Sequence, residues 1–189
     1  MHPDNDLRKP KSKLNKGKHH GPSLLTYIGS EGIENGLKNK PGLLAELCRQ
    51  VATLGPFDRA IYERFMQCYW EGVGLLVAKS PPVKQFVARI MPLAVNLEAT
   101  DTSFAGHFQI DDGCVHGGPG MVAFRDQDFR FFGSTRVLMS LLNNELPLGY
   151  ADLHLHSEGH PGLGRFLFPV MRKIAQLTKD SEMAGSSYE

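Results

Sequence analysis

The 189-residue sequence has few cysteines and no long apolar run. Its three cysteines, Cys48, Cys68 and Cys114, are widely spaced and form no C-x-x-C pair. This pattern argues against a disulfide framework and a thiolate zinc site, and it favours a reducing compartment. The sequence also lacks an apolar signal core near its start and any run of about 18 uncharged apolar residues. We therefore expect a cytoplasmic protein without a membrane span.

The chain has almost no net charge, with 21 basic and 20 acidic residues. This balance gives no overall attraction to nucleic acid, which we do not expect as a partner. The charge is uneven, because residues 1–20 contain six basic side chains and only two acidic ones. We interpret this segment as a disordered, solubilising tail. An arm that contacts RNA or an anionic membrane is the alternative role of such a tail.

The first half of the chain is predicted to be a tail followed by helices. Residues 1–40 are expected to be a disordered basic tail and linker, because glycines and polar residues predominate after the basic segment. Apolar residues at helical spacing then predict about three helices in residues 41–98. The third helix begins after Pro82, and Pro92 should kink or shorten it. These helices are expected to pack on the rest of the chain. The alternatives are that they cover a pocket in the part of the chain that follows, form a homodimer contact or dock on partner enzymes.

In residues 99–179 the spacing of apolar residues changes from the helical period of about 3.6 residues to the strand period of 2, and later returns to the helical period. Alternation in FAGHFQI, GMVAFRD, DFRFFGS and DLHLHSE predicts strands. The glycine-rich segment 117–120 is expected to interrupt the second strand as a bulge or loop. Helices are predicted at TRVLMSLLNNE and at residues 161–179, with a flexible tail at 180–189. Hairpin strands followed by helices predict an α+β fold, in which helices cover one face of an antiparallel sheet.

The order DFRFFGS, TRVLMSLLNNE and LHLHSEGHPGLGRFLFPVMRKI resembles the sterol carrier protein 2 (SCP2) superfamily over roughly residues 100–178. The added helices are similar to those of bacterial SCP2-like accessory proteins of ubiquinone synthesis. The chain departs from the family pattern at Asn143-Asn144-Glu145 and at the GGPG segment. The resemblance implies a cavity between sheet and helices for a sterol, a fatty acyl group or an isoprenoid quinone. It also implies a non-enzymatic carrier or accessory role without a cofactor.

The predicted pocket lining consists of apolar residues that we expect to point inward from the strands and helices. An ordinary hydrophobic core is the alternative interpretation of each of them, since apolar residues are usually buried. The set is Phe104, Phe108, Val122, Phe124, Phe129, Phe131, Leu138, Leu142, Leu153, Leu155, Phe166, Leu167 and Val170.

Several histidines suggest a second hypothesis, a small metal-dependent enzyme. His154 and His156 share one strand face, Glu158 and His160 follow, and His107 lies on the polar side of another predicted strand. A metal site needs about three such ligands within roughly 2.0–2.2 Å of one ion. His-x-His alone is weakly specific, so we interpret this face as solvated and predict no metal site.

The segment containing Asp111, Asp112, Cys114 and His116 raises the possibility of a Cys-His nucleophile. The sequence provides no positioned oxyanion element beside it. A tight turn at Asp111-Asp112-Gly113 explains the pattern better. We therefore predict no catalytic residue.

Overall fold

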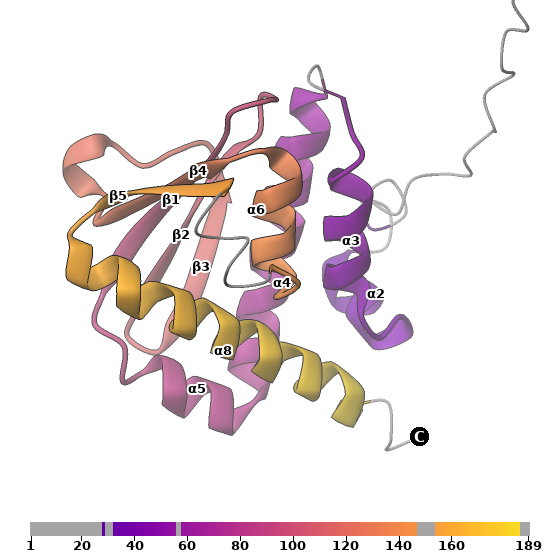
Figure 1. Cartoon of the computed structure of the whole chain (residues 1–189). Coiled ribbons are helices and arrows are strands. Elements are labelled where there is room, and N and C mark those ends of the chain that lie inside the picture. The colour runs from indigo at the N-terminus through magenta and orange to yellow at the C-terminus, as the bar shows by residue number, and fades with distance from the viewer. Residues whose placement is uncertain (1–27, 29–31, 56–57, 147–153, 186–189) are drawn as a thin grey trace, which may run out of the picture.

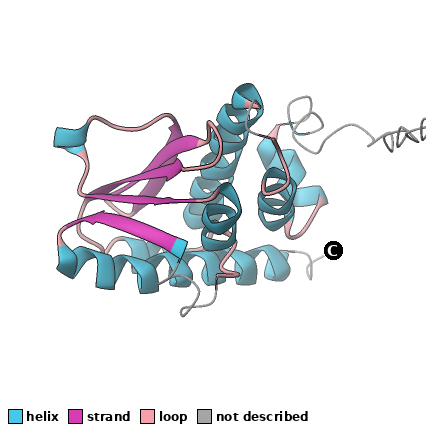
Figure 2. Cartoon of the chain, turned by 45° about the horizontal axis from the view of Figure 1, so that its top comes forward, coloured by secondary structure: helices cyan, strands magenta, loops and turns pink. Residues whose placement is uncertain are grey.

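A computed structural model describes residues 28, 32–55, 58–146 and 154–185 of the chain. It contains a five-stranded sheet with helices gathered on one side (Figures 1 and 2). This arrangement confirms the predicted α+β class. The strands are β1 (Leu93–Ala99), β2 (Ala105–Asp111), β3 (Cys114–Pro119), β4 (Phe129–Gly133) and β5 (Leu155–Gly159).

The helices lie before, within and after the run of strands. Among the described residues, none of them is both long and apolar enough to cross a membrane. They are α2 (Ile33–Asn39), α3 (Leu43–Val51), α4 (Arg59–Lys79), α5 (Pro81–Val87), α6 (Thr135–Leu142) and α8 (Pro161–Gly185), together with the short 3-10 helix η1 (Phe124–Asp126).

Two predicted flexible segments contain helix. Residues 33–39, which we expected to be linker, form α2, and Ile33 is buried. Helix α8 continues to Gly185, beyond the predicted end at residue 179. The basic segment 1–20 lies outside the described residues.

The central strand β1 corrects the sequence prediction. Residues 93–98 were assigned to the helical segment, because Ile90, Met91 and Ala94 fit a helical period. Helix α5 instead ends at Val87, and Pro92 precedes an extended strand. Proline lacks the N–H that a helix interior requires. The predicted division of the chain into a helical segment and a separate α+β domain remains a prediction.

The sheet is mixed, where we expected it to be antiparallel. Its order is β3-β2-β1-β4-β5. β1, β2 and β3 form an antiparallel meander, and the chain then crosses to the other side of β1 to add β4. β4 runs parallel to β1, and β5 pairs antiparallel with β4. A strand that follows a crossing connection can enter in either direction, which alternation along the sequence does not specify.

The first three residues of the GGPG segment belong to β3, where we predicted a bulge or loop, and the strand ends at Pro119. The predicted strand at GMVAFRD does not form, because residues 121–123 lead directly into η1. Gly117 pairs with Phe108 and Gly118 with His107 in a continuous ladder. A Cβ added at Gly117 would lie 2.4 Å from the His107 carbonyl oxygen and 2.7 Å from Cγ of Trp70. The glycine therefore permits close approach of α4 to the sheet, which is another role of glycine in strands.

One hydrophobic core joins the helices to the sheet. From α4, the rings of Tyr62 and Phe65 lie 5.8 Å and 6.2 Å from that of Phe104. From α8, Phe168 contacts Phe131 edge-on, with 5.7 Å between ring centroids. Figure 1 shows α8 running from β5 toward the side of the molecule that carries α2 and α3.

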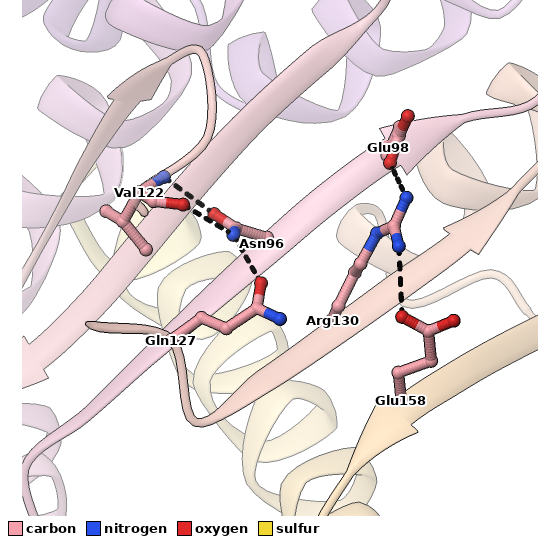
Figure 3. Close-up of polar contacts among 6 residues, drawn as sticks. All are labelled: Asn96, Glu98, Val122, Gln127, Arg130 and Glu158. Atoms are coloured by element: carbon pink, nitrogen blue, oxygen red, sulfur yellow. Dashed lines mark hydrogen bonds and ion pairs between the residues drawn. The ribbon is translucent and has the colours of Figure 1, made fainter. Parts of the chain in front are cut away.

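The other face of the sheet is crossed by the segment that connects β3 to β4. Asn96 of β1 holds this segment and is only 2% exposed. Its amide nitrogen donates to the Val122 carbonyl (3.0 Å) and to Oε1 of Gln127 (2.6 Å). Its amide oxygen accepts from the Val122 N–H (2.9 Å). Figure 3 shows these two hydrogen bonds between the Asn96 side chain and the Val122 backbone. They resemble the pair of backbone hydrogen bonds that joins two residues in adjacent strands.

Replacing Gly117 with alanine should destabilise the fold by about 1–3 kcal/mol, because the added methyl group overlaps Trp70 and the β2 backbone. Gly118→Ala is the matched control in the same strand, because its added Cβ meets only Cε1 of His107, at 3.8 Å. It should change the free energy of unfolding by less than about 0.5 kcal/mol. Urea denaturation followed by circular dichroism measures both, and equal losses would contradict this account.

Asn96→Ala should lower the free energy of unfolding by about 1–3 kcal/mol, because it leaves the Val122 backbone groups unpaired. Gln109→Ala is the control: Gln109 lies on the same face, and its side chain pairs only with the exposed His116. That variant should lose less than about 0.5 kcal/mol. Hydrogen exchange at Val122 should accelerate in the Asn96 variant alone; unchanged exchange would show that Asn96 does not hold the segment.

Candidate ligand-binding site

A small apolar cavity lies between the sheet and the helices α4, α6 and α8. Its volume is about 20 Å³, which is room for about one water molecule. Nearly every wall side chain is apolar, as is typical of sites for hydrophobic ligands. The lining residues are Tyr69, Trp70, Val73, Phe108, Val115, Leu141, Leu142, Met171, Ile174 and Ala175.

Trp70 is fixed in the wall of this cavity by its neighbours. Its ring stacks on Phe108, with centroids 4.8 Å apart and planes inclined by 28°. The ring of Tyr69 meets it edge-on at 5.1 Å. Gly117 presents bare backbone to the Cγ–Cδ1 edge of the indole. Aromatic pairs of this kind contribute about 0.5–1.5 kcal/mol each beyond their buried area, so the ring has a defined position.

The polar groups of the lining residues Tyr69 and Trp70 differ in their hydrogen bonding. The Tyr69 hydroxyl donates to the Leu142 carbonyl oxygen at 2.8 Å, which also ties α4 to the end of α6. The indole Nε1 of Trp70 is buried and has no acceptor among the described residues.

The predicted lining residues are spread over more than this cavity. Phe108 and Leu142 border it. The remaining buried members lie elsewhere in the same core, and their role as ligand contacts stays a prediction. They are Phe104, Phe129, Phe131, Leu138, Leu155, Leu167 and Val170.

Three members of the set do not point inward as predicted. Phe124 is 83% exposed, because η1 lies in the crossing segment rather than in a strand. Val122 is half-buried on the same outer face of the sheet, beside Asn96. Phe166 is 45% exposed on α8, since the apolar stripe of that helix passes through Leu167 instead. Leu153 lies outside the described residues.

The contribution of α4 to the cavity was not assigned from the sequence to particular lining residues. Tyr69, Trp70 and Val73 come from a helix that we expected to pack on the rest of the chain, with covering of the pocket as an alternative. Helical periodicity shows that such residues are buried, but it does not show which partner they face. From α8, Met171, Ile174 and Ala175 were missed for the same reason.

The histidine hypothesis fails on geometry. His107 lies on β2 and His156 on β5, three strand spacings apart, which is about 14 Å. His107 Nδ1 donates to the Gly120 carbonyl (2.9 Å), and His156 stacks on Phe132 with 5.3 Å between centroids. His154 is exposed before β5. No group of three potential metal ligands converges within the part of the chain that the structure describes.

A charged cluster occupies the outer face beside these histidines. Arg130 is held between Glu98 and Glu158, with its bond to Glu158 at 2.9 Å (Figure 3). The hydrogen bond from Arg130 to Glu98 is the main reason that the pKa of Arg130 is raised above its ordinary value. The guanidinium also lies 5.2 Å from the centre of the Phe132 ring. This cluster joins β1, β4 and β5 across the sheet, which is a structural role.

The Cys-His hypothesis also lacks the geometry it needs. Cys114 and His116 are two residues apart on β3, so their backbones are separated by about 7 Å. His116 Nε2 is hydrogen-bonded to Oε1 of Gln109 at 3.0 Å. In the core, burial raises the pKa of the Cys68 thiol, and this favours its protonated, less reactive form.

Neither a scan of protein-family models nor a search of curated proteins finds a match to this chain. Solved structures do show similarity. A structure named UbiJ-SCP2 ubiquinone synthesis protein shares 15% identity at a TM-score of 0.43 and covers 59% of this chain and 90% of its own. Sterol carrier protein 2 from Yarrowia lipolytica, in its apo form, shares 9% identity at a TM-score of 0.40 and covers 69% and 97%.

The sterol carrier protein domain 2 of Helicoverpa armigera is similar to a comparable extent. It shares 15% identity at a TM-score of 0.37 and covers 57% of this chain and 86% of its own. SCP2 structures are therefore among those similar to this chain, as the sequence resemblance implied. At these identities and TM-scores we draw the function from the geometry of the cavity and not from the likeness.

Proposed function

We propose that this protein binds a hydrophobic small molecule between its sheet and α8, and that it acts as a carrier or accessory protein rather than as an enzyme. The apolar cavity around Trp70 and Phe108 is the observation that supports this proposal. Sterols, fatty acyl groups and isoprenoid quinones are the ligand classes implied by the sequence resemblance. A cytoplasmic location and delivery to partner enzymes remain predictions.

Binding requires the cavity to enlarge. Ligand pockets usually measure about 300–1,000 Å³, and this one is about 20 Å³. Helix α8 is the element best suited to move, because it covers the cavity from one side and contacts the core along one stripe. That stripe includes Leu167, Val170, Met171 and Ile174. Methionine adapts readily to a new packing arrangement, so Met171 can follow a ligand as the helix shifts.

Proline in α8 supports this movement. Pro169 lies inside the helix and is exposed. It removes one internal hydrogen bond and creates a point at which the helix bends at low cost. The bend would separate the first turns, anchored at β5, from the segment containing Met171 and Ile174. The proposal thus assigns α8 the role of a cover that opens from its C-terminal part.

Titration with 11-(dansylamino)undecanoic acid tests the proposal directly. The chain contains a single tryptophan, so energy transfer to the dansyl group reports binding near Trp70. We expect saturable transfer at about one probe per chain. Absence of saturable binding, measured both by energy transfer and by equilibrium dialysis, would overturn the proposed function.

Ala175→Phe should weaken binding of this probe by roughly tenfold, because the added ring fills the cavity and removes contacts that the ligand would make. Gln176→Phe is the matched control: it places the same ring one residue further along α8, on the exposed surface. Its affinity should stay within about twofold of wild type. Equal loss in both variants would show that the ligand does not enter this cavity.

A further inference from the structure

Helix α8 carries a concentration of positive charge. Its residues 161–179 contain no acidic side chain, whereas the whole chain is almost neutral, with 21 basic and 20 acidic residues. Arg172 and Lys173 of this helix are exposed, and its apolar stripe, which includes Met171, belongs to the core. The helix therefore turns its cations outward and its apolar side chains inward. The basic residues of the segment are Arg165, Arg172, Lys173 and Lys179.

The exposed cations of α8 are not neutralised by their surroundings. Within the described part of the chain, neither Arg172 nor Lys173 forms an ion pair. Arg172 Nε donates to Oδ1 of Asn144 at 3.2 Å, which is an uncharged partner, and the exposed Glu145 next to it is not bonded to Arg172. Helix α5 packs beside α8 (Figure 1), contributes the exposed Lys84 and contains no acidic residue.

An exposed aromatic ring accompanies these cations. Phe166 is 45% exposed on α8. Phe166, Pro169 and Lys173 follow one another at spacings of three and four residues, which places them on one side of the helix. Basic side chains together with an exposed phenylalanine are typical of helices that lie on the interface of a bilayer. The cations attract lipid phosphates there, and the ring leaves water for the headgroup region.

We propose that the exposed face of α8 contacts the surface of an anionic membrane. Phosphate groups of the lipids pair with Arg172 and Lys173, and the ring of Phe166 lies among the headgroups. Charge complementarity supports this partner, because an anionic lipid surface attracts basic side chains that lie within a Debye length of it. The inference goes beyond the proposed function and does not require it. Taken with that function, the contact places the cover of the cavity against a lipid surface.

Co-sedimentation of the full chain with sucrose-loaded vesicles tests the charge contact. Phosphatidylcholine vesicles with about 30 mol% phosphatidylglycerol should bind wild type at about 50 mM salt, and pure phosphatidylcholine vesicles should not. Arg172→Gln/Lys173→Gln should weaken this binding roughly tenfold or more, because two cations at the lipid surface are lost. Arg59→Gln/Arg125→Gln is the matched control: it removes the same charge at two exposed positions, at the start of α4 and on the opposite face of the sheet. Its binding should stay within about threefold of wild type.

Phe166→Ser tests the contribution of the exposed ring. Binding to the same anionic vesicles should weaken roughly threefold to tenfold, because the variant buries less apolar surface in the headgroup region. Phe124→Ser is the control, since Phe124 is 83% exposed on the opposite face of the sheet. Its binding should stay within about twofold of wild type. Circular dichroism checks that every variant is folded.

The outcomes separate this inference from the proposed function. Equal losses in the α8 double variant and its control would assign the attraction to overall charge or to residues 1–20, and would overturn the inference. Failure of wild type to bind anionic vesicles would also overturn it, and would leave the α8 cations to a protein or nucleic-acid partner. The dansyl titration contains no membrane. Its failure would overturn the proposed function and leave the membrane contact standing.

Discussion

The stacking of Trp70 on Phe108, over a strand that carries glycine at position 117, fixes the relation between the first half of the chain and the sheet. A side chain at 117 would push α4 away from β3. The close approach places Tyr69 near the end of α6, where its hydroxyl bonds to the Leu142 carbonyl. The remaining walls of the cavity, from α6 and α8, are arranged around this contact.

The two faces of the sheet serve different purposes. The inner face joins α4, α6 and α8 in one core and borders the cavity. The outer face is organised by polar groups: Asn96 holds the crossing segment, and Arg130 bridges Glu98 and Glu158. These polar contacts stabilise the sheet without occupying the inner face, so the inner face can remain apolar.

The small volume of the cavity, about 20 Å³, is informative. A void that holds one water costs little packing energy, whereas a preformed lipid-sized cavity would remove many van der Waals contacts. In the proposed function, α8 avoids this loss, because its apolar stripe would occupy the place of the ligand until one binds.

The sequence by itself determined the α+β class and the burial of Phe108, Leu142 and most other apolar residues in the predicted set, because apolar periodicity reports which side of an element is covered. It did not determine that residues 93–98 form the central strand, since the short run after Pro92 fits both periods. It also did not place Phe124 outside or Trp70 at the cavity. Those positions depend on which elements meet across the core. The packing of α4 on Gly117 likewise depends on tertiary contacts. Partners distant in sequence leave no local pattern, so only the tertiary structure brought Trp70, Gly117 and Met171 together.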